Sequence, residues 1–315
     1  MKCLLIGCGG IGALHDWNRG EITSYAKAFE HIRVKPFFYD IDRRKSARVV
    51  ARYGGCALQT WDQKPMKYYD LVVISTPTQT HYHYLKRILK DPPRLIICEK
   101  PVAEKIGQLN ELLALYKKNN AKVLVNYHRR FQPKMKKLSK QVLAIHAKSQ
   151  LRNIVITYQK GLFNNGSHAV DLLGFLFSRP FKPRNIKIYG TFKEQLLNDA
   201  TVTLTCDWQG AQIIFVGLSK IKISYFDVDL YFEDQALKIG NCGNWAKIYK
   251  PGNKNGKYFP KLIVAGQQKD ICKNAILHTL AHAKKLLKNP SLPDNFENSI
   301  QVSTTLIQIR QKKKR

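Results

Sequence analysis

The chain contains 315 residues, and its composition of 44% apolar and 24% charged residues excludes an intrinsically disordered protein. Its 53 lysine and arginine residues outnumber 22 acidic ones, and the net charge of +31 favours anionic partners such as nucleic acid, a membrane surface or a phosphorylated small molecule. The seven cysteines include no Cys-x-x-Cys pair, so we expect neither a metal site nor a disulfide framework, and a reducing, cytoplasmic compartment fits best. No apolar run reaches the roughly 18 residues of a membrane-spanning helix, so we expect no membrane partner.

Short apolar runs alternate with helix-like stretches over the first 125 residues. Most of these runs are too continuously apolar to have a solvated face, which is typical of strands buried on both faces of a parallel sheet. This order predicts βαβ units, and therefore a doubly wound parallel sheet in an N-terminal domain of residues 1–125. The expected strands are residues 3–6, 34–39, 71–75, 95–98 and 122–125, and the expected helices are residues 43–53, 80–90 and 106–119.

Beyond residue 125 several expected strands alternate apolar with polar residues, as residues 200–205 do. Such alternation is typical of an antiparallel sheet with one solvated or partner-covered face, and Trp208-Gln209-Gly210 predicts a hairpin. We therefore expect residues 126–315 to form an α+β domain for substrate binding and oligomerisation, built on an open, mostly antiparallel sheet flanked by helices. The expected strands are residues 154–159, 186–189, 200–207, 211–218 and 225–232, the expected helices are residues 133–146, 168–177, 271–288 and 298–311, and residues 250–261 are expected to form a loop.

A glycine-rich segment directly follows the first expected strand. Residues 7–12 fit the pattern Gly-x-Gly-x-x-Gly and precede a helix-like stretch, which is the context of a dinucleotide-binding Rossmann fold. Gly7 permits the tight turn, Gly9 lets the backbone approach a pyrophosphate, and Gly12 lets a helix pack closely on the strand. The alternative is a glycine-rich turn without a ligand. The expected cofactor contacts in this loop are Gly7, Gly9, Gly10, Ile11 and Gly12.

An acidic residue, Asp40, ends the second expected strand. It lies 28 residues after Gly12 instead of the usual spacing of about 20, and an insertion around residues 16–21 accounts for the excess. A carboxylate here accepts hydrogen bonds from the ribose hydroxyls and repels a 2′-phosphate, so NAD is favoured. Arg43 and Arg44 follow closely and keep NADP open, because a guanidinium group accommodates a phosphate. The alternative for Asp40 is an ordinary acidic residue at a strand end.

Four further motifs follow the glycine-rich loop in order, at residues 75–81, 98–103, 126–131 and 161–171. They include Ser75-Thr76-Pro77, Glu99-Lys100-Pro101, Asn126-Tyr127-His128-Arg129-Arg130-Phe131 and Asn164-Asn165-Gly166-Ser167-His168. Together with the glycine loop, this set resembles the glucose–fructose oxidoreductase, inositol dehydrogenase and MocA family. The forms of the last two motifs look most like those of members found near surface-polysaccharide genes.

The resemblance implies roles for residues at the ends of the expected strands. In the family, the lysine that corresponds to Lys100 reaches the nicotinamide and the reacting sugar hydroxyl, and the peptide bond after it is often cis. Glu99 would lie against the cofactor, and Thr76 and Pro77 would form the wall beside the dinucleotide. His81 would lie close by; equally, it could be a residue of the helix start without a ligand.

His168 is the second candidate for a reactive group that the resemblance provides. The family usually has an aspartate four residues before this histidine, where the present chain has Asn164. On a helix, residues 164, 168 and 171 would share one face, so Asn164, His168 and Asp171 would converge. An amide cannot carry charge and so cannot raise the basicity of His168 as a carboxylate would. The alternative for His168 is a structural histidine of the core. We expect Arg129, Arg130, Asn165 and Asp171 to contact the substrate.

The expected reaction is hydride transfer between a sugar carbon and C4 of the nicotinamide. We expect His168 to act as the base and Lys100 to polarise the reacting oxygen, with the reverse assignment open. Twelve lysine or arginine residues and no acidic residue lie between Glu111 and Asp171, which favours an anionic, nucleotide-linked or carboxylated sugar if part of this charge faces the substrate. The alternative is a solvated basic surface.

Two rival functions remain open at this point. Asn164 in place of an aspartate would suit a dinucleotide-binding regulator without catalysis. The net charge would suit a nucleic-acid-binding protein, although no helix-turn-helix, zinc-finger or RNA-binding signature stands out. The relatives are dimers or tetramers, so the resemblance implies a homo-oligomer.

Overall fold

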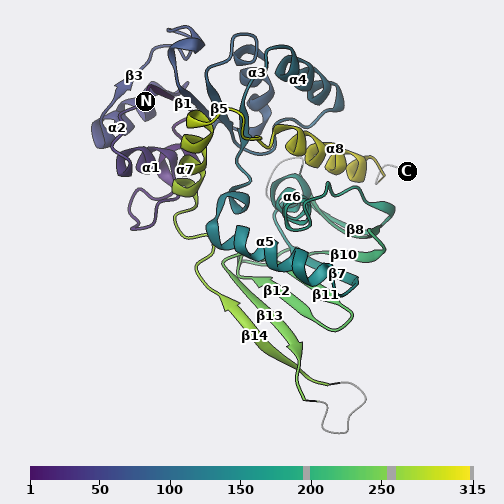
Figure 1. Cartoon of the computed structure of the whole chain (residues 1–315). Helices are drawn as coiled ribbons and strands as arrows, with labels where there is room; N and C mark the ends of the chain where they lie inside the picture. Colours follow the sequence, from purple (N-terminus) through teal and green to yellow (C-terminus); the bar gives the residue numbers. More distant parts are fainter. Residues whose placement is uncertain (194–198, 254–259, 313–315) are drawn as a thin grey trace. The chain divides into compact units, whose positions relative to one another are not determined.

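The computed structural model describes residues 1–193, 199–253 and 260–312 (Figure 1). The chain forms two compact units, each with its own sheet. The first unit combines Met1–Phe131 with Lys273–Ser303, and the second combines Gln132–Cys272 with Thr304–Arg315. None of the helices in the described ranges is both long and apolar enough to cross a membrane.

The first unit contains a six-stranded sheet in the order β3-β2-β1-β4-β5-β6, and every pair in it is parallel. This confirms the doubly wound sheet, with the strand order reversing between β1 and β4. The strands are β1 (Cys3–Ile6), β2 (Phe37–Tyr39), β3 (Cys56–Ala57), β4 (Leu71–Ile74), β5 (Leu95–Cys98) and β6 (Val123–Val125). The helical segments are η1 (Gly10–Leu14), α1 (Tyr25–His31), α2 (Arg43–Tyr53), η2 (Met66–Tyr68), α3 (Thr78–Ile88), α4 (Ile106–Lys118), η3 (His128–Phe131), α7 (Ala275–Lys288) and α8 (Phe296–Lys312), whose last turns belong to the second unit.

The second strand is shorter than the apolar pattern of residues 34–39 predicts. The N–H group of Val34 donates to the carbonyl oxygen of Phe29 at 2.9 Å, and Arg33 has a positive φ of 56°. These residues therefore complete the C-terminal turn of helix α1, and the strand begins only at Phe37.

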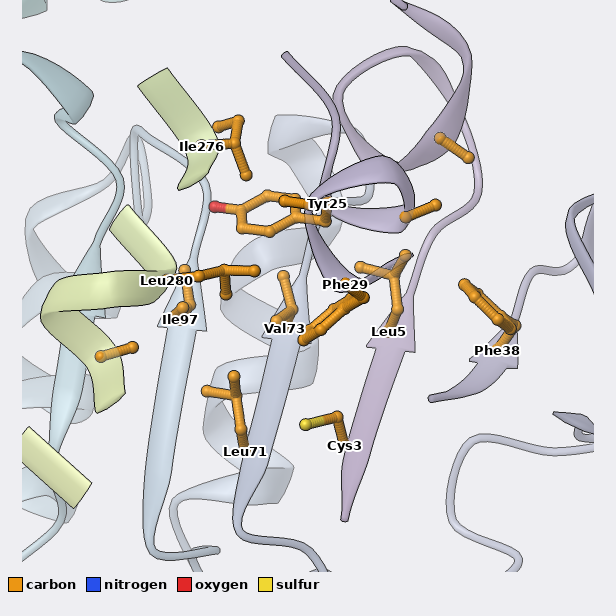
Figure 2. Close-up of a cluster of buried hydrophobic side chains, with 14 of the residues drawn as sticks. Cys3, Leu5, Tyr25, Phe29, Phe38, Leu71, Val73, Ile97, Ile276 and Leu280 are labelled. Carbon is orange, nitrogen blue, oxygen red and sulfur yellow. The ribbon is translucent and has the colours of Figure 1, made fainter. Parts of the chain in front are cut away.

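Helix α7 contributes to the core of the first unit, although more than 140 residues separate it from residue 131. Figure 2 shows Ile276 and Leu280 of this helix packed with Tyr25 and with Ile97 of β5. These side chains are at most 2% exposed. The expected boundary after residue 125 therefore differs from the observed division, because the first unit is completed by a segment that returns from the end of the chain.

The free edge of this sheet is covered by residues that precede helix α8. Asn295 accepts a hydrogen bond from the N–H group of Val125 and donates one to its carbonyl oxygen, both at 2.9 Å. Asp294 accepts a hydrogen bond from the N–H group of Val123 at 2.9 Å. The two side chains thus satisfy backbone groups that an edge strand otherwise exposes.

The second unit contains an eight-stranded sheet in the order β14-β13-β12-β11-β7-β10-β9-β8. All neighbouring strands are antiparallel except β7 and β10, which confirms a mostly antiparallel sheet. The predicted hairpin is confirmed, with Trp208 paired to Ala211 across a turn of two residues that have positive φ. The strands are β7 (Leu151–Tyr158), β8 (Arg184–Lys193), β9 (Ala200–Trp208), β10 (Ala211–Gly217), β11 (Phe226–Phe232), β12 (Ala236–Gly240), β13 (Trp245–Pro251) and β14 (Leu262–Gln268), with helical segments α5 (Pro133–His146), η4 (Gly161–Gly166) and α6 (Ser167–Leu176).

The strands β12, β13 and β14 were not expected from the sequence pattern. Strand β14 carries Leu262, Ile263 and Val264, all about half exposed, so it lacks the alternation of buried and exposed positions that marks a strand. The expected loop at residues 250–261 begins two residues too early, because β13 extends to Pro251, while residues 252, 253, 260 and 261 have no regular secondary structure. Residues 254–259 of that loop lie outside the described residues.

Candidate active site

The glycine loop leaves β1 in the geometry that the spacing of its glycines predicts. Gly7 has a φ of +95°, and its N–H group donates to the carbonyl oxygen of Tyr39 at 2.8 Å. A Cβ atom on Gly12 would lie 2.1 Å from the carbonyl oxygen of Gly7, whereas a Cβ atom on Gly9 would have no neighbour within 4 Å. Gly12 is thus required for packing, and Gly9 borders open space in which a ligand can approach the backbone.

The backbone N–H groups of the loop are available to an anion. The N–H groups of residues 9–12 make no hydrogen bond to another residue within the described ranges. Unpaired N–H groups at the start of a helical turn are the donors that bind a pyrophosphate in dinucleotide sites. The arrangement therefore fits a dinucleotide cofactor.

The helix expected directly after the loop is interrupted. Only a single π-helical turn, η1, follows before a loop of residues 15–24 leads to helix α1. The buried carboxylate of Asp16 organises this loop, because it accepts hydrogen bonds from the N–H groups of Thr23 and Ser24 and from the Ser24 hydroxyl, at 2.6–2.7 Å. The insertion predicted from the long spacing between Gly12 and Asp40 is therefore this loop.

Asp40 lies beside the glycine loop. Its Oδ2 atom accepts a hydrogen bond of 2.7 Å from the N–H group of Cys8, and its Oδ1 atom accepts one of 2.9 Å from the backbone N–H group of Asp42. Arg43 and Arg44 are exposed at the first turn of helix α2. The carboxylate is thus fixed next to the loop, while the two guanidinium groups remain in solvent.

The loops after β4 and β5 lie at the same edge of the sheet as the glycine loop, because all these strands are parallel. Ser75, directly after β4, donates from Oγ to the carbonyl oxygen of Gly7 at 2.8 Å. Thr76 follows it, and its hydroxyl accepts a hydrogen bond of 2.8 Å from Thr80. Pro77 precedes the first residue of helix α3. The edge between β1 and β4 is the place where ligands bind in doubly wound sheets.

Lys100 follows β5 in a turn whose preceding residue, Glu99, belongs to a hydrogen-bonded network. Oε1 of Glu99 accepts hydrogen bonds from the hydroxyl of Tyr25 at 3.0 Å and from the side-chain amide of Asn126 at 2.6 Å. The hydroxyl of Thr279, on helix α7, lies 2.9 Å from Oδ1 of Asn126. Burial raises the pKa of Glu99, while the hydrogen bond from Asn126 and the charge of Lys100 act in the opposite direction. The Lys100–Pro101 peptide bond is cis.

His81 is buried on the first turns of helix α3. Its Nδ1 atom lies 2.7 Å from the carbonyl oxygen of Pro101, and its Nε2 atom lies 2.7 Å from the carbonyl oxygen of Thr76. Burial, and to a smaller extent the charge of Lys100, lower the pKa of its imidazole. Both ring nitrogens therefore face backbone carbonyl groups.

Arg129 and Arg130 lie on the short helix η3 in the first unit, directly after β6 and Asn126. Arg129 is 6% exposed and Arg130 is half-buried. The neighbouring Phe131 stacks on the ring of His282 of α7, with centroids 5.0 Å apart. The motif therefore follows the sheet edge that carries the other candidate residues.

The remaining candidates belong to the second unit. Asn164 and Asn165 lie on the π-helical turn η4, and His168 and Asp171 lie on helix α6, so the single helix expected through residues 164–171 is not regular. His168 and the two asparagines are half-buried, and Asp171 is only 2% exposed. Their contact with a substrate stays a prediction.

A carboxylate does contact the turn η4, but it belongs to a residue that the sequence analysis did not identify. Asp199, just before β9, accepts hydrogen bonds from the N–H groups of Phe163 at 2.9 Å and Asn164 at 2.8 Å. Tyr25, Thr279 and Asp16 were likewise not predicted. No local pattern marks them, whereas Asn126 was detectable because it directly follows strand β6 at the site edge.

Comparisons with known proteins agree with this geometry. Residues 1–127 match the family described as "Oxidoreductase family, NAD-binding Rossmann fold". Inositol 2-dehydrogenase from Rhizobium meliloti is 31% identical over 135 residues, which are 41% of this chain and 36% of that protein. The uncharacterized oxidoreductase YrbE from Bacillus subtilis is 27% identical over 139 residues, 42% of this chain and 37% of that protein. The chain thus matches little more than a third of the length of these relatives.

Solved structures resemble nearly the whole chain. A UDP-N-acetylglucosamine 3-dehydrogenase from Acidithiobacillus ferrooxidans has a TM-score of 0.76 at 16% identity, covering 99% of this chain and 97% of that one. A 3-ketoreductase from Actinomadura kijaniata, in complex with NADP and TDP-benzene, has a TM-score of 0.72 at 15% identity, with the same coverage. At such identities the likeness shows the fold alone. The family description confirms a nicotinamide dinucleotide, NAD(P), as the expected cofactor, and residues 1–127 match the model of the glucose–fructose oxidoreductase, inositol dehydrogenase and MocA family.

Proposed function

We propose that the protein is an NAD(P)-dependent oxidoreductase that transfers a hydride between the nicotinamide and a hydroxyl-bearing carbon of a sugar or nucleotide-sugar. The observation that carries this proposal is the placement of the glycine loop and the Lys100 turn at one edge of a parallel sheet, after β1 and β5. A dinucleotide held by the free N–H groups at residues 9–12 would extend along this edge toward Lys100.

The residues of the candidate site would have separate roles in cofactor binding and in catalysis. The bound cofactor supplies or accepts the hydride at C4 of its nicotinamide. Asp40 holds the ribose hydroxyls, which favours NAD over NADP. Lys100 polarises the sugar oxygen, and His168 takes the hydroxyl proton as the hydride leaves the carbon, with the reverse assignment of the two residues kept as an alternative.

An anionic sugar is the substrate class that we favour. Arg129 and Arg130 lie on η3, a few residues after β6, and a guanidinium group binds a diphosphate or carboxylate in a bidentate manner. The names of two proteins of similar fold, a UDP-N-acetylglucosamine 3-dehydrogenase and a ketoreductase complexed with TDP-benzene, agree with a nucleotide-linked substrate. We further propose a role in surface-polysaccharide biosynthesis, and a homo-dimer or homo-tetramer.

A second candidate function, a dinucleotide-binding regulator, is favoured by Asn164. The carboxylate that Asn164 lacks is present nearby in Asp199, but that carboxylate binds backbone N–H groups. A regulator would bind the dinucleotide and turn over no sugar.

The test is an assay of the purified protein with NAD and NADP against matched neutral sugars and nucleotide-sugars. We expect turnover of a nucleotide-sugar, and we expect Lys100→Ala to lower kcat by about 10²–10⁴-fold while dinucleotide binding persists. Equal or faster turnover of neutral sugars would contradict the substrate class. Unchanged turnover by Lys100→Ala would remove Lys100 from the chemistry, and binding without any turnover would favour the regulator.

A further inference from the structure

The imidazole of His81 connects the two loops that border the candidate site. Its Nε2 atom lies 2.7 Å from the carbonyl oxygen of Thr76, in the loop after β4. Its Nδ1 atom lies 2.7 Å from the carbonyl oxygen of Pro101, the residue that follows Lys100. The side chain is 1% exposed, so water does not compete for either contact.

The number of N–H groups on the imidazole ring determines how many of the two carbonyl groups it can bond. A carbonyl oxygen only accepts hydrogen bonds, so each ring nitrogen must carry a proton to bond its partner. A neutral imidazole has one N–H group and can hold one loop, whereas an imidazolium has two and can hold both. Burial and the charge of Lys100 favour the neutral ring, and the two carbonyl groups favour the charged one. In either state at least one of the loops is bonded to the ring.

We propose that His81 is a positioning residue, which fixes the Lys100 turn against the start of helix α3 by donating a hydrogen bond from Nδ1 to the carbonyl oxygen of Pro101, a bond that both the Nδ1–H tautomer of the neutral ring and the imidazolium can make. This inference rests on the proposed function, because its consequence for turnover depends on Lys100 reaching the reacting oxygen. A catalytic group displaced by about 1 Å costs about 10²-fold in rate, so the loss of such a tie is measurable.

This role differs from direct contact with the cofactor. Both ring nitrogens of His81 are directed at backbone oxygens, and the ring is enclosed. A cofactor contact would require the ring to leave these partners. The effect of His81 is therefore expected in kcat, which depends on the placement of Lys100, and not in the affinity for the dinucleotide.

The chain offers a matched control on the same helix. His83 is exposed, and its ring contacts that of Tyr82 with centroids 5.2 Å apart. The test therefore compares His81→Phe, which keeps an aromatic ring without donors, with His83→Phe. His81→Gln restores a side-chain NH2 group that can donate to a carbonyl oxygen, and it serves as the conservative variant.

Two measurements are made on each variant. The first is amide hydrogen exchange of the peptide covering residues 98–104 in the protein without cofactor or substrate. The second is the kcat, KM and dinucleotide Kd with the substrate that wild type turns over. We expect His81→Phe to exchange faster in this peptide and to lose about 10²-fold in kcat at unchanged dinucleotide Kd. His81→Gln should recover part of both, and His83→Phe should match wild type.

Unchanged exchange and unchanged kcat in His81→Phe would overturn the inference, as would a weaker dinucleotide affinity with unchanged kcat. Equal losses in His81→Phe and His83→Phe would also overturn it, because they would reflect the helix as a whole. If wild type turns over no substrate, the proposed function fails, and the exchange measurement alone decides on His81. If His81→Phe does not fold, His81→Gln and its exchange relative to wild type decide.

Discussion

The side-chain amide of Asn126 donates a hydrogen bond of 2.6 Å to Oε1 of Glu99, the residue immediately before Lys100. The same oxygen atom accepts a hydrogen bond from Tyr25, and Asn126 is itself bonded to Thr279. Helices α1 and α7 and the ends of β5 and β6 are thereby joined through one carboxylate. A buried polar network whose members are all satisfied is rigid, so this one holds the start of the Lys100 turn in place.

The raised pKa of Glu99 predicts a specific dependence of stability on pH. Below its ordinary pKa of 4.5 the carboxyl is protonated in both the folded and unfolded states. As the pH rises above 4.5, the unfolded state loses the proton first, so the folded state binds more protons and the free energy of unfolding falls. We expect wild type to lose stability relative to Glu99→Gln over this rise, until the pH passes the folded pKa. Denaturant unfolding of both proteins from pH 4 upward measures the difference, and a constant difference would contradict the prediction.

Two glycines of the loop predict opposite results for the same substitution. Gly12→Ala places a Cβ atom 2.1 Å from the Gly7 carbonyl oxygen, and we expect it to cost about 1–3 kcal/mol of stability. Gly9→Ala meets no atom within 4 Å, so stability should change by no more than about 0.5 kcal/mol while dinucleotide binding is lost. Thermal unfolding and titration with NAD and NADP separate the two effects. Full binding by Gly9→Ala would place the pyrophosphate elsewhere.

Asp40 is predicted to set the choice of cofactor. Asp40→Ala removes the acceptor of the Cys8 and Asp42 N–H groups and the proposed partner of the ribose. Hydrogen bonds to a charged group are worth about 1.5–3 kcal/mol, so NAD affinity should fall about tenfold to a hundredfold while NADP affinity falls less. The matched variant Arg44→Ala should leave NAD affinity unchanged. Equal losses for both cofactors in Asp40→Ala would speak against selection at this position.

Asn295 is predicted to stabilise the free edge of the first sheet. Asn295→Ala removes both hydrogen bonds to the backbone of Val125, and burial leaves these groups without water. We expect a loss of about 1–3 kcal/mol in the free energy of unfolding. Asn298→Ala, at an exposed position of helix α8, serves as the control and should change stability by about 0.5 kcal/mol or less. Similar values for the two variants would show that the edge contact contributes nothing.

Elements with a strong local pattern could be predicted from the sequence. The strands at residues 3–6 and 95–98 and the helix at residues 43–53 have their predicted bounds, because each is a continuous apolar run or an amphipathic repeat with clear ends. Helix α1 was missed because it has only seven residues and follows a loop held by Asp16. Strand β14 was missed because its consecutive apolar residues are exposed, which a burial pattern does not anticipate.

The same distinction between local sequence pattern and long-range contact applies to the residues of the candidate site. The glycine loop could be predicted because its chemistry requires a fixed local spacing. The partners of Glu99 could not, because Tyr25 and Asn126 lie 74 and 27 residues away in sequence, and Thr279 is 153 residues from Asn126. The role of His81 likewise depends on carbonyl groups of two different loops, which no sequence motif specifies.

The return of helix α7 to the first unit has a consequence for biosynthesis. The ribosome completes residue 131 well before residue 273, and at about 5–20 residues per second the interval is on the order of 10 s. During that interval Tyr25 and Ile97 of the nascent chain lack the apolar packing contacts that Ile276 and Leu280 later provide. The first unit thus completes its core only after helix α7 has been synthesised, and a chaperone that shields apolar surface would act on the nascent chain before then.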